Sequence, residues 1–239
     1  MAKYYAPTCG AVSEKEKAHM EAIRKFAPEC IVLLENDGVL PLKKTGKLAL
    51  YGAGARMTVK GGTGSGDVNS RTVINIEQGL EAAGFEITTK SWMDGYSADV
   101  AKAKQDYFMN LKARAAKEGV TEFALMFSNP FKEPDGAAIT DEQIKASDTD
   151  TAVYVIARNS GEGADRSMGR GDYMLTEAEL EHIKKLAAAY KHTIVLLNVG
   201  GVIDTSELKG IEGVNAIVLV SQLGNIGGYA VADALTGKA

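Results

Sequence analysis

Apolar and polar positions form two kinds of pattern that alternate along the chain. Near-continuous apolar runs occupy residues 47–54, 151–158, 193–200 and 214–221. Short runs with little polar interruption are typical of strands buried on both faces, as in a parallel sheet. Weaker apolar runs at 85–92 and 122–128 are further strand candidates.

Helical patterns lie between these runs. The segment 13–36 begins with Ser13 and carries Glu16 three residues later. This is the spacing of a capping box, in which each of the two side chains accepts a hydrogen bond from the other residue's backbone N–H. Pro28 predicts that this helix kinks or ends there, because proline lacks the N–H and clashes with the preceding turn.

The segment 176–190 repeats the capping signature with Thr176 and Glu179, and its later apolar residues fall on one helix face. A further helical pattern ends near Gly84, a residue suited to the left-handed position after a helix. Strand and helix patterns that alternate throughout predict an α/β layered fold with helices on both faces of the sheet.

The charge balance limits the partners that the chain can have. Lys and Arg number 27 and Asp and Glu 31, for a net charge of −4. This weak acidity argues against a nucleic-acid or anionic-membrane surface. No apolar run approaches the roughly 20 residues that span a bilayer, and the first ten residues lack the apolar core of a secretory signal.

Cysteine and histidine give no sign of a metal site, and no cofactor is expected. Cys9 and Cys30 have neither metal-ligand nor disulfide-framework spacing, which predicts a reduced, cytoplasmic setting with Cys30 buried as a small apolar side chain. His19, His182 and His192 lie in helical or helix-end patterns rich in Lys and Glu, and we expect them at the surface.

Two loops follow predicted strands, where open α/β sheets form their sites. The first is the glycine loop, residues 60–71, in which glycine permits a close approach of backbone to ligand. Its glycines are Gly61, Gly62, Gly64 and Gly66. A phosphate cradle, a sugar-hydroxyl contact and a plain connection all fit, although neither GxxxxGKS/T nor GxGxxG occurs. Asn69 or Ser70 is expected to cap the helix that follows.

The second loop, "SGEGADR", follows the run 151–158 and holds Glu162 between Gly161 and Gly163. The flanking glycines place this carboxylate at a mobile loop tip, where it is either a solvated turn acid or a catalytic group. Asp165 and Arg166 are expected to form an ion pair that holds the loop. The residues alone leave both interpretations of Glu162 open.

Several blocks of sequence, in order, resemble one known family. They are "RKFAPECIVLLENDGVLPL", "KGGTGSGDVN", "SGEGADR" followed by "GDYMLTEAELEHI", "IVLLNVGGVID" and "QLGNIGGYAVADALTGKA". From about residue 20 to the last residue, the chain resembles the C-terminal-type domain of glycoside hydrolase family 3, and most closely that of bacterial β-glucosidases.

The resemblance implies a three-layer α/β/α sandwich of about six mostly parallel strands, formed by residues 1–239 as a single domain. It also implies that this domain is half of a retaining β-glucosidase that acts on β-D-glucosides. A separate barrel domain carries the substrate pocket and the nucleophilic aspartate in the family. Some relatives place the sandwich first, so the barrel is expected downstream. The isolated domain is expected to be inactive and to expose an apolar docking face through which a homodimer could form.

The resemblance also implies roles for individual residues. Glu162 matches the general acid/base, and Ser65 matches a contact to the sugar in the reacting subsite. Gly64 and Gly66 would shape the loop around Ser65, and Asp165 and Arg166 would support the loop that carries Glu162. A retaining glycosidase needs two carboxyl groups about 5–5.5 Å apart, so burial of Glu162 against the barrel would complete the pair and raise its pKa.

Departures from the family pattern leave alternatives open. Ala164 stands where many members have a bulky residue, and "QLGNIGG" lacks the glutamate of the usual block. A β-xylosidase or related exo-glycosidase domain is one alternative, and a nucleotide-binding domain is disfavoured by the glycine spacing. A non-catalytic carbohydrate-binding or docking module is another, although aromatics are only 7% of residues and Trp92 is the sole tryptophan.

Overall fold

The computed structural model describes residues 10–159 and 166–239, apart from the side chain of Ser65. A six-stranded sheet in the order β1-β6-β5-β4-β2-β3 forms its centre. The strands are β1 (Val32–Asn36), β2 (Lys47–Tyr51), β3 (Glu86–Ile87), β4 (Thr151–Arg158), β5 (His192–Val199) and β6 (Val214–Leu219). All neighbouring strands pair in parallel except β1, which is antiparallel to β6. The predicted mostly parallel α/β fold is confirmed.

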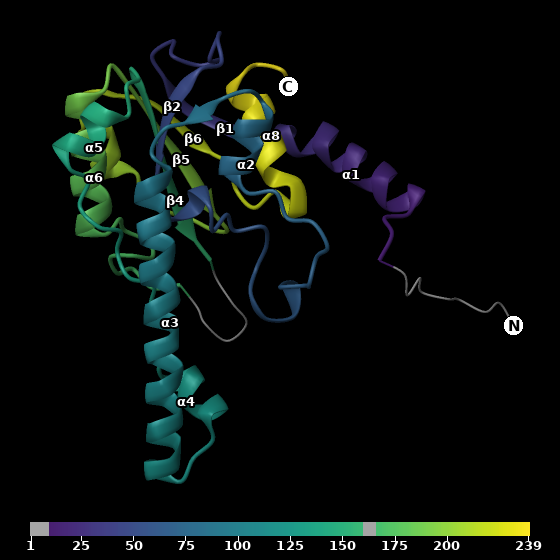
Figure 1. Ribbon diagram of the computed structural model, residues 1–239, viewed down its shortest axis with the longest axis vertical. Helices are drawn as coiled ribbons and strands as arrows, with labels where there is room; N and C mark the ends of the chain where they lie inside the picture. Colours follow the sequence, from purple (N-terminus) through teal and green to yellow (C-terminus); the bar gives the residue numbers. More distant parts are fainter. Residues whose placement is uncertain (1–9, 160–165) are drawn as a thin grey trace, which may run out of the picture.

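Helices cover both faces of this sheet (Figure 1). They are α1 (Glu14–Phe26), α2 (Ile76–Ala82), α3 (Lys90–Glu118), α4 (Glu122–Ser128), α5 (Asp141–Ala146), α6 (Glu177–Ala189), α7 (Ser206–Lys209) and α8 (Gly227–Leu235). On one face α2 packs on α8 so closely that a Cβ on Gly79 would lie 1.9 Å from the Gly228 carbonyl oxygen. On the other face the Trp92 ring of α3 meets the His182 ring of α6, 5.9 Å between centroids. The three-layer sandwich is therefore complete.

The capping boxes are present as predicted. Ser13 and Glu16 cap α1, and Thr176 and Glu179 cap α6. Helix α1 ends at Phe26 just before the Pro28 turn, and Gly84 follows α2 with a φ of 98°. These signals involve residues within a few positions of one another, so they do not depend on tertiary contacts.

Other expectations about the elements were wrong in whole or in part. The run 122–128 is the helix α4, because Thr121 caps it and Leu125 packs on α3. The strand expected in the run 85–92 is confirmed, but only as the short β3, and α3 begins within the same run at Lys90. Helix α2 is capped by Asn75 rather than by Asn69 or Ser70, since the chain runs irregularly as far as Asn75.

The segment after Pro28 also differs from expectation. Residues 32–36, which were included in the first helical pattern, form β1, an edge strand whose side chains are mostly exposed. Cys30, in the turn before this strand, is exposed rather than buried. Because β1 lies at the edge of the sheet, its apolar side chains are less covered than those of the central strands. An apolar sequence does not show whether a strand lies at the edge or in the centre.

Helix α3 is much longer than the sandwich that it covers. Its 29 residues extend about 43 Å, and its distal half projects from the body together with α4 (Figure 1). The first half buries Trp92, Met93, Tyr96 and Val100 against the core, whereas the distal half packs with α4 through Leu111, Ala115 and Leu125. No strand or helix pattern in the sequence predicted this projecting arm.

His182 lies in the core rather than at the surface, with only 4% of its area exposed. Its Nδ1 is 3.1 Å from the Tyr154 hydroxyl, and its ring meets Trp92 edge-on. Burial lowers the pKa of His182 below its usual 6.5, although the nearby carboxylates of Asp135, Glu179 and Glu181 oppose this effect. At pH 7 and above, the lowered pKa therefore favours the neutral form of this histidine in the folded protein.

Acidification is expected to destabilise the fold through His182. As the pH falls below the unfolded value of 6.5, the unfolded chain binds a proton that the folded state accepts only at its lower pKa. Thermal unfolding of wild type should therefore show a fall in Tm from pH 7 to 5.5, at about 2–4 °C for each kcal/mol lost. The slope should be smaller for His182→Gln and unchanged for His19→Gln, which alters an exposed histidine. Equal slopes in all three proteins would contradict the assignment.

Candidate functional site

A cleft of about 910 Å³ opens at the carboxyl ends of β2 and β4. Its lining comes from segments distant in sequence, which are Ala53 with residues 57–61, Thr63 and Asp67, residues 130–136, residues 157–159, and Ser167 with residues 170–172. Trp92, Tyr96 and Tyr154 contribute aromatic side chains, and Thr176, Ala178 and Glu179 complete the lining. The volume and mixed lining are those of a small-molecule site, and the position is where open α/β sheets bind ligands.

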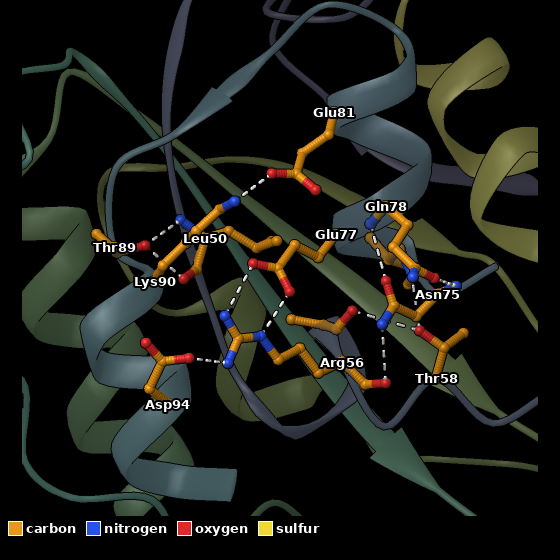
Figure 2. A network of polar contacts seen from close by, with 12 residues as sticks. Leu50, Arg56, Thr58, Asn75, Glu77, Gln78, Glu81, Thr89, Lys90 and Asp94 are labelled. Atoms are coloured by element: carbon orange, nitrogen blue, oxygen red, sulfur yellow. Dashed lines mark hydrogen bonds and ion pairs between the residues drawn. The ribbon is translucent and has the colours of Figure 1, made fainter.

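The chain after β2 leads to the cleft-lining residues 57–61, and a network of charged side chains holds it in place (Figure 2). Arg56 donates to the buried Glu77 carboxylate of α2, with Nε–Oε2 at 2.5 Å, and to Asp94 of α3, with Nη1–Oδ1 at 2.5 Å. The Glu77 carboxylate raises the pKa of Arg56, so the guanidinium stays charged. Helices α2 and α3, which lie on opposite faces of the sheet, thereby hold Arg56 just before the cleft-lining residues 57–61.

Asn198 anchors the start of the glycine loop from the end of β5. Its Oδ1 accepts from the Val59 N–H at 2.6 Å, and its Nδ2 donates to the carbonyls of Val59 at 3.0 Å and Ser221 at 2.7 Å. The side chain is almost fully buried. Sequence reasoning missed this residue, although an amide inside the apolar run 193–200 was a usable signal.

Removing this amide is expected to free the glycine loop. Asn198→Ala leaves the Val59 N–H and C=O without their partner, which should lower the free energy of unfolding by about 1–3 kcal/mol. Hydrogen exchange of the Val59 amide should also accelerate by more than that of the core strands. Asn129→Ala, which alters an exposed asparagine, is the control and should change stability by less than about 0.5 kcal/mol. Unaltered exchange at Val59 would argue against the anchoring role.

The glycine loop borders the cleft, but not through every residue singled out. Gly61, Thr63 and Asp67 line it, while Gly64 and Gly66 lie in an exposed 3-10 turn, Gly64–Gly66. Gly64 has a φ of 77°, which favours glycine, whereas a Cβ on Gly66 would meet nothing within 4 Å.

The loop is fixed near the cleft by Lys60, whose Nζ donates to the Val68 carbonyl at 2.6 Å and lies 3.2 Å from the Asp67 carboxylate. Ser65 belongs to the same turn, but its side chain is outside the described residues. The roles assigned to Ser65, Gly64 and Gly66 therefore stay predictions.

Glu162 and Asp165 lie outside the described residues, so their roles also stay predictions. The chain on either side of them is described, and both Asn159 and Ser167 line the cleft. The two loops that the sequence singled out thus border one cleft, although they come from different parts of the chain.

Arg166 supports this region through Asp172. Its Nε donates to the Asp172 carboxylate and its Nη2 to the Asp172 carbonyl at 2.9 Å. Partial burial alone would raise the pKa of Asp172, but the Ser167 N–H and the Arg166 guanidinium outweigh it and hold this pKa below its usual value. The carboxylate that pairs with Arg166 among the described residues is therefore Asp172, and the expected pairing with Asp165 stays untested.

A buried ion pair lies behind the same loop. Arg158, the last residue of β4, donates to both carboxylate oxygens of Glu179 at 2.7 and 2.5 Å, and its Nε donates to the Asp172 carbonyl at 3.1 Å. Glu179 also accepts from the Thr176 N–H at 2.8 Å, as the capping residue of α6. The sequence identified Glu179 only as a helix cap, because its partner Arg158 lies 21 positions earlier, at the end of the preceding strand.

Neither a metal centre nor a membrane span is found in the described part of the chain. Within residues 10–159 and 166–239, no three His, Cys, Asp or Glu side chains are grouped so that they could hold a metal ion. No helix among the same residues is both long and apolar enough to cross a bilayer.

Comparison with known proteins gives consistent matches along most of the chain. Residues 31–239 match the model of the Glycosyl hydrolase family 3 C-terminal domain. Beta-glucosidase A of Butyrivibrio fibrisolvens is 31% identical over 245 residues, covering 92% of this chain and 27% of that protein. A probable exo-1,4-beta-xylosidase of Aspergillus flavus is 27% identical over 218 residues, covering 91% of this chain and 23% of that protein.

Solved structures match this chain with sequence identity and coverage close to those of Beta-glucosidase A. Beta-glucosidase 3B from Thermotoga neapolitana in complex with glucose superimposes with a TM-score of 0.70 at 32% identity, covering 93% of this chain and 29% of that chain. This chain therefore spans between a fifth and a third of the length of the proteins that it matches.

Proposed function

Because the chain belongs to the family of the Glycosyl hydrolase family 3 C-terminal domain, we propose that it is one domain of a retaining β-glucosidase. Its proposed role is to supply the general acid/base, Glu162, and to contact the reacting sugar through Ser65. One observation carries the proposal, which is that the chain flanking both residues borders a single cleft at the carboxyl ends of β2 and β4. The bacterial relatives described above are beta-glucosidases, which supports the choice of reaction.

In the proposed reaction the nucleophile comes from a barrel domain outside this chain. A carboxylate of the barrel attacks the anomeric carbon while the Glu162 carboxylic acid gives its proton to the glycosidic oxygen, which leaves as an alcohol. Water then attacks the glycosyl ester and loses its proton to the Glu162 carboxylate, which restores both groups. Glu162 must hold its proton before the first step, and burial beside the nucleophile would raise its pKa accordingly.

The described residues would position these groups. Asn198 and Lys60 hold the glycine loop, while Arg166, with Asp172, holds the chain that returns from the loop of Glu162. Both attachments come from side chains that are themselves hydrogen-bonded, so the cleft walls are fixed before substrate binds. Such preorganisation lowers the entropic cost of bringing the reacting groups together.

The test compares the isolated chain with the full-length product of its gene on 4-nitrophenyl β-D-glucoside. We expect turnover by the full-length protein and none by the isolated chain, because the proposed nucleophile belongs to the barrel domain. Hydrolysis by the isolated chain would overturn the shared site and direct the search to carboxylates within the chain, beginning with Asp67 and Asp165.

A β-xylosidase is the second candidate, and the match to the exo-1,4-beta-xylosidase supports it. The acid/base chemistry would be the same, since the two sugars differ only in the hydroxymethyl group on the pyranose ring. Parallel assays with 4-nitrophenyl β-D-xyloside separate the candidates. A higher kcat/KM for the xyloside than for the glucoside would replace the first proposal with the second.

A further inference from the structure

The side of the cleft next to α3 is formed by a segment that no motif singled out. Residues 129–137, here called the strap, form most of the connection from α4 to α5 and have no regular structure. Residues 130–136 of the strap all line the cleft. In Figure 1, α3 lies on one side of the carboxyl ends of the central strands and the glycine loop lies on the other. The strap and the glycine loop are therefore the two side walls of the cleft.

Helix α3 holds the strap along much of its length. The Tyr107 hydroxyl donates to the Asn129 carbonyl at 2.7 Å, the Tyr96 hydroxyl to Pro134 at 3.2 Å, and the Trp92 indole N–H to Ala137 at 2.9 Å. At a rise of about 1.5 Å per residue, Trp92 and Tyr107 are about 22 Å apart along the helix.

The strap therefore runs antiparallel to α3, from the projecting arm toward the inside of the sandwich. Near its inner end Gly136 lies flat on the Trp92 ring, where a Cβ would come within 2.7 Å of a ring carbon.

Phe131 lies toward the outer end of this wall. The centroid of the Phe131 ring is 5.4 Å from that of the Tyr107 ring, and the Lys104 Nζ lies over the Phe131 ring, 5.7 Å from its centroid. The side chain is only half-buried and it lines the cleft. An aromatic ring supported from behind by other side chains, with part of its surface free, is a preorganised platform for a flat apolar ligand surface.

Polar side chains follow Phe131 along the strap. Lys132, Glu133 and Asp135 are exposed and line the same wall. A pyranose ring presents an apolar face together with hydroxyls that donate and accept hydrogen bonds. One aromatic face beside several charged groups is the combination that matches this chemistry.

We propose that the strap binds the leaving group of the substrate, with Phe131 stacking on a sugar ring beyond the bond that is cleaved. This inference rests on the proposed function, in which the glycine loop contacts the sugar whose anomeric carbon reacts. The wall on the other side of the cleft then faces the remainder of the substrate. Its extent along α3 matches a leaving group of one or more sugar rings, so the substrate class is a short β-linked gluco-oligosaccharide.

The test uses Phe131→Ala in the full-length enzyme with two substrates that differ in the leaving group. Cellotriose leaves two sugar rings on the strap side, whereas β-D-glucosyl fluoride leaves only a fluoride ion. We expect kcat/KM for cellotriose to fall about tenfold, the usual scale of one lost aromatic contact. The value for β-D-glucosyl fluoride should stay within about twofold of wild type, because that substrate does not reach the strap.

Two further variants keep the comparison specific. Phe131→Tyr preserves the ring and should keep the wild-type preference for cellotriose. Phe123→Ala removes a ring of α4 that is 68% exposed and does not line the cleft, and it should leave both substrates unaffected.

The outcomes separate this inference from the proposed function. Equal losses for both substrates in Phe131→Ala, or no loss for either, would overturn the inference and leave the proposed function standing. No turnover of either substrate by wild type would overturn the proposed function, and the inference with it.

Discussion

Glu162→Ala in the full-length enzyme is expected to lower kcat for cellobiose by about a thousandfold, within the range for loss of a general acid/base. Cellobiose has a poor leaving group, so its departure depends on the proton from Glu162. The loss should be smaller for 2,4-dinitrophenyl β-D-glucoside, whose leaving group needs no proton. Steady-state kinetics on the two substrates measures this difference.

Azide provides the second measurement on this variant. A small anion can occupy the space of the missing carboxylate and attack the glycosyl–enzyme without help from a base, giving β-glucosyl azide with retained configuration. Glu181→Ala, which removes an exposed carboxylate of α6, is the control and should behave as wild type. Wild-type turnover of cellobiose by Glu162→Ala, without azide product, would exclude Glu162 as the acid/base.

Of the single substitutions considered for stability, Glu179→Ala is expected to lower the free energy of unfolding the most. It leaves the Arg158 guanidinium buried without its counter-ion, and it removes the acceptor for the Thr176 N–H at the start of α6. Breaking a buried pair from one side costs about 3–5 kcal/mol. Urea unfolding followed by circular dichroism measures the change in the free energy of unfolding.

Two comparisons show whether burial is the cause. Glu118→Ala breaks an exposed pair with Arg114, Nε–Oε1 at 3.0 Å, and should cost less than about 1 kcal/mol. The double variant Arg158→Met/Glu179→Met removes both charges and should recover much of the loss, because no unpaired charge remains. If the double variant were as unstable as the sum of the single changes, desolvated charge would not be the reason.

The sequence predicted the elements whose signals are local. The pairs Ser13–Glu16 and Thr176–Glu179 specify helix starts through contacts three residues apart, and the structure contains both capping boxes. The runs at 151–158 and 193–200 specify buried strands because their residues are apolar at both faces, and they form β4 and β5 over nearly the same residues. These patterns hold wherever the segment lies in the fold.

The conformation of two short apolar segments differed from the prediction. The run 122–128 could be a strand or a helix by its composition, and the contact of Leu125 with α3 accompanies the helical outcome. Residues 32–36 looked helical beside the real helix before them, yet they pair with β6. The partner of such a segment decides its conformation, and the partner is distant in sequence.

The site divides in the same way. Two glycine-containing loops follow predicted strands, and this order along the chain was enough to expect them at one edge of the sheet. The folded chain was needed to find that Asn198 anchors one loop and that Arg158 pairs with Glu179 behind the other. It was also needed to find that the strap borders the cleft along α3. Each of these contacts joins residues at least 20 positions apart, and a hydrogen bond or ion pair at that separation leaves no periodic trace in the sequence.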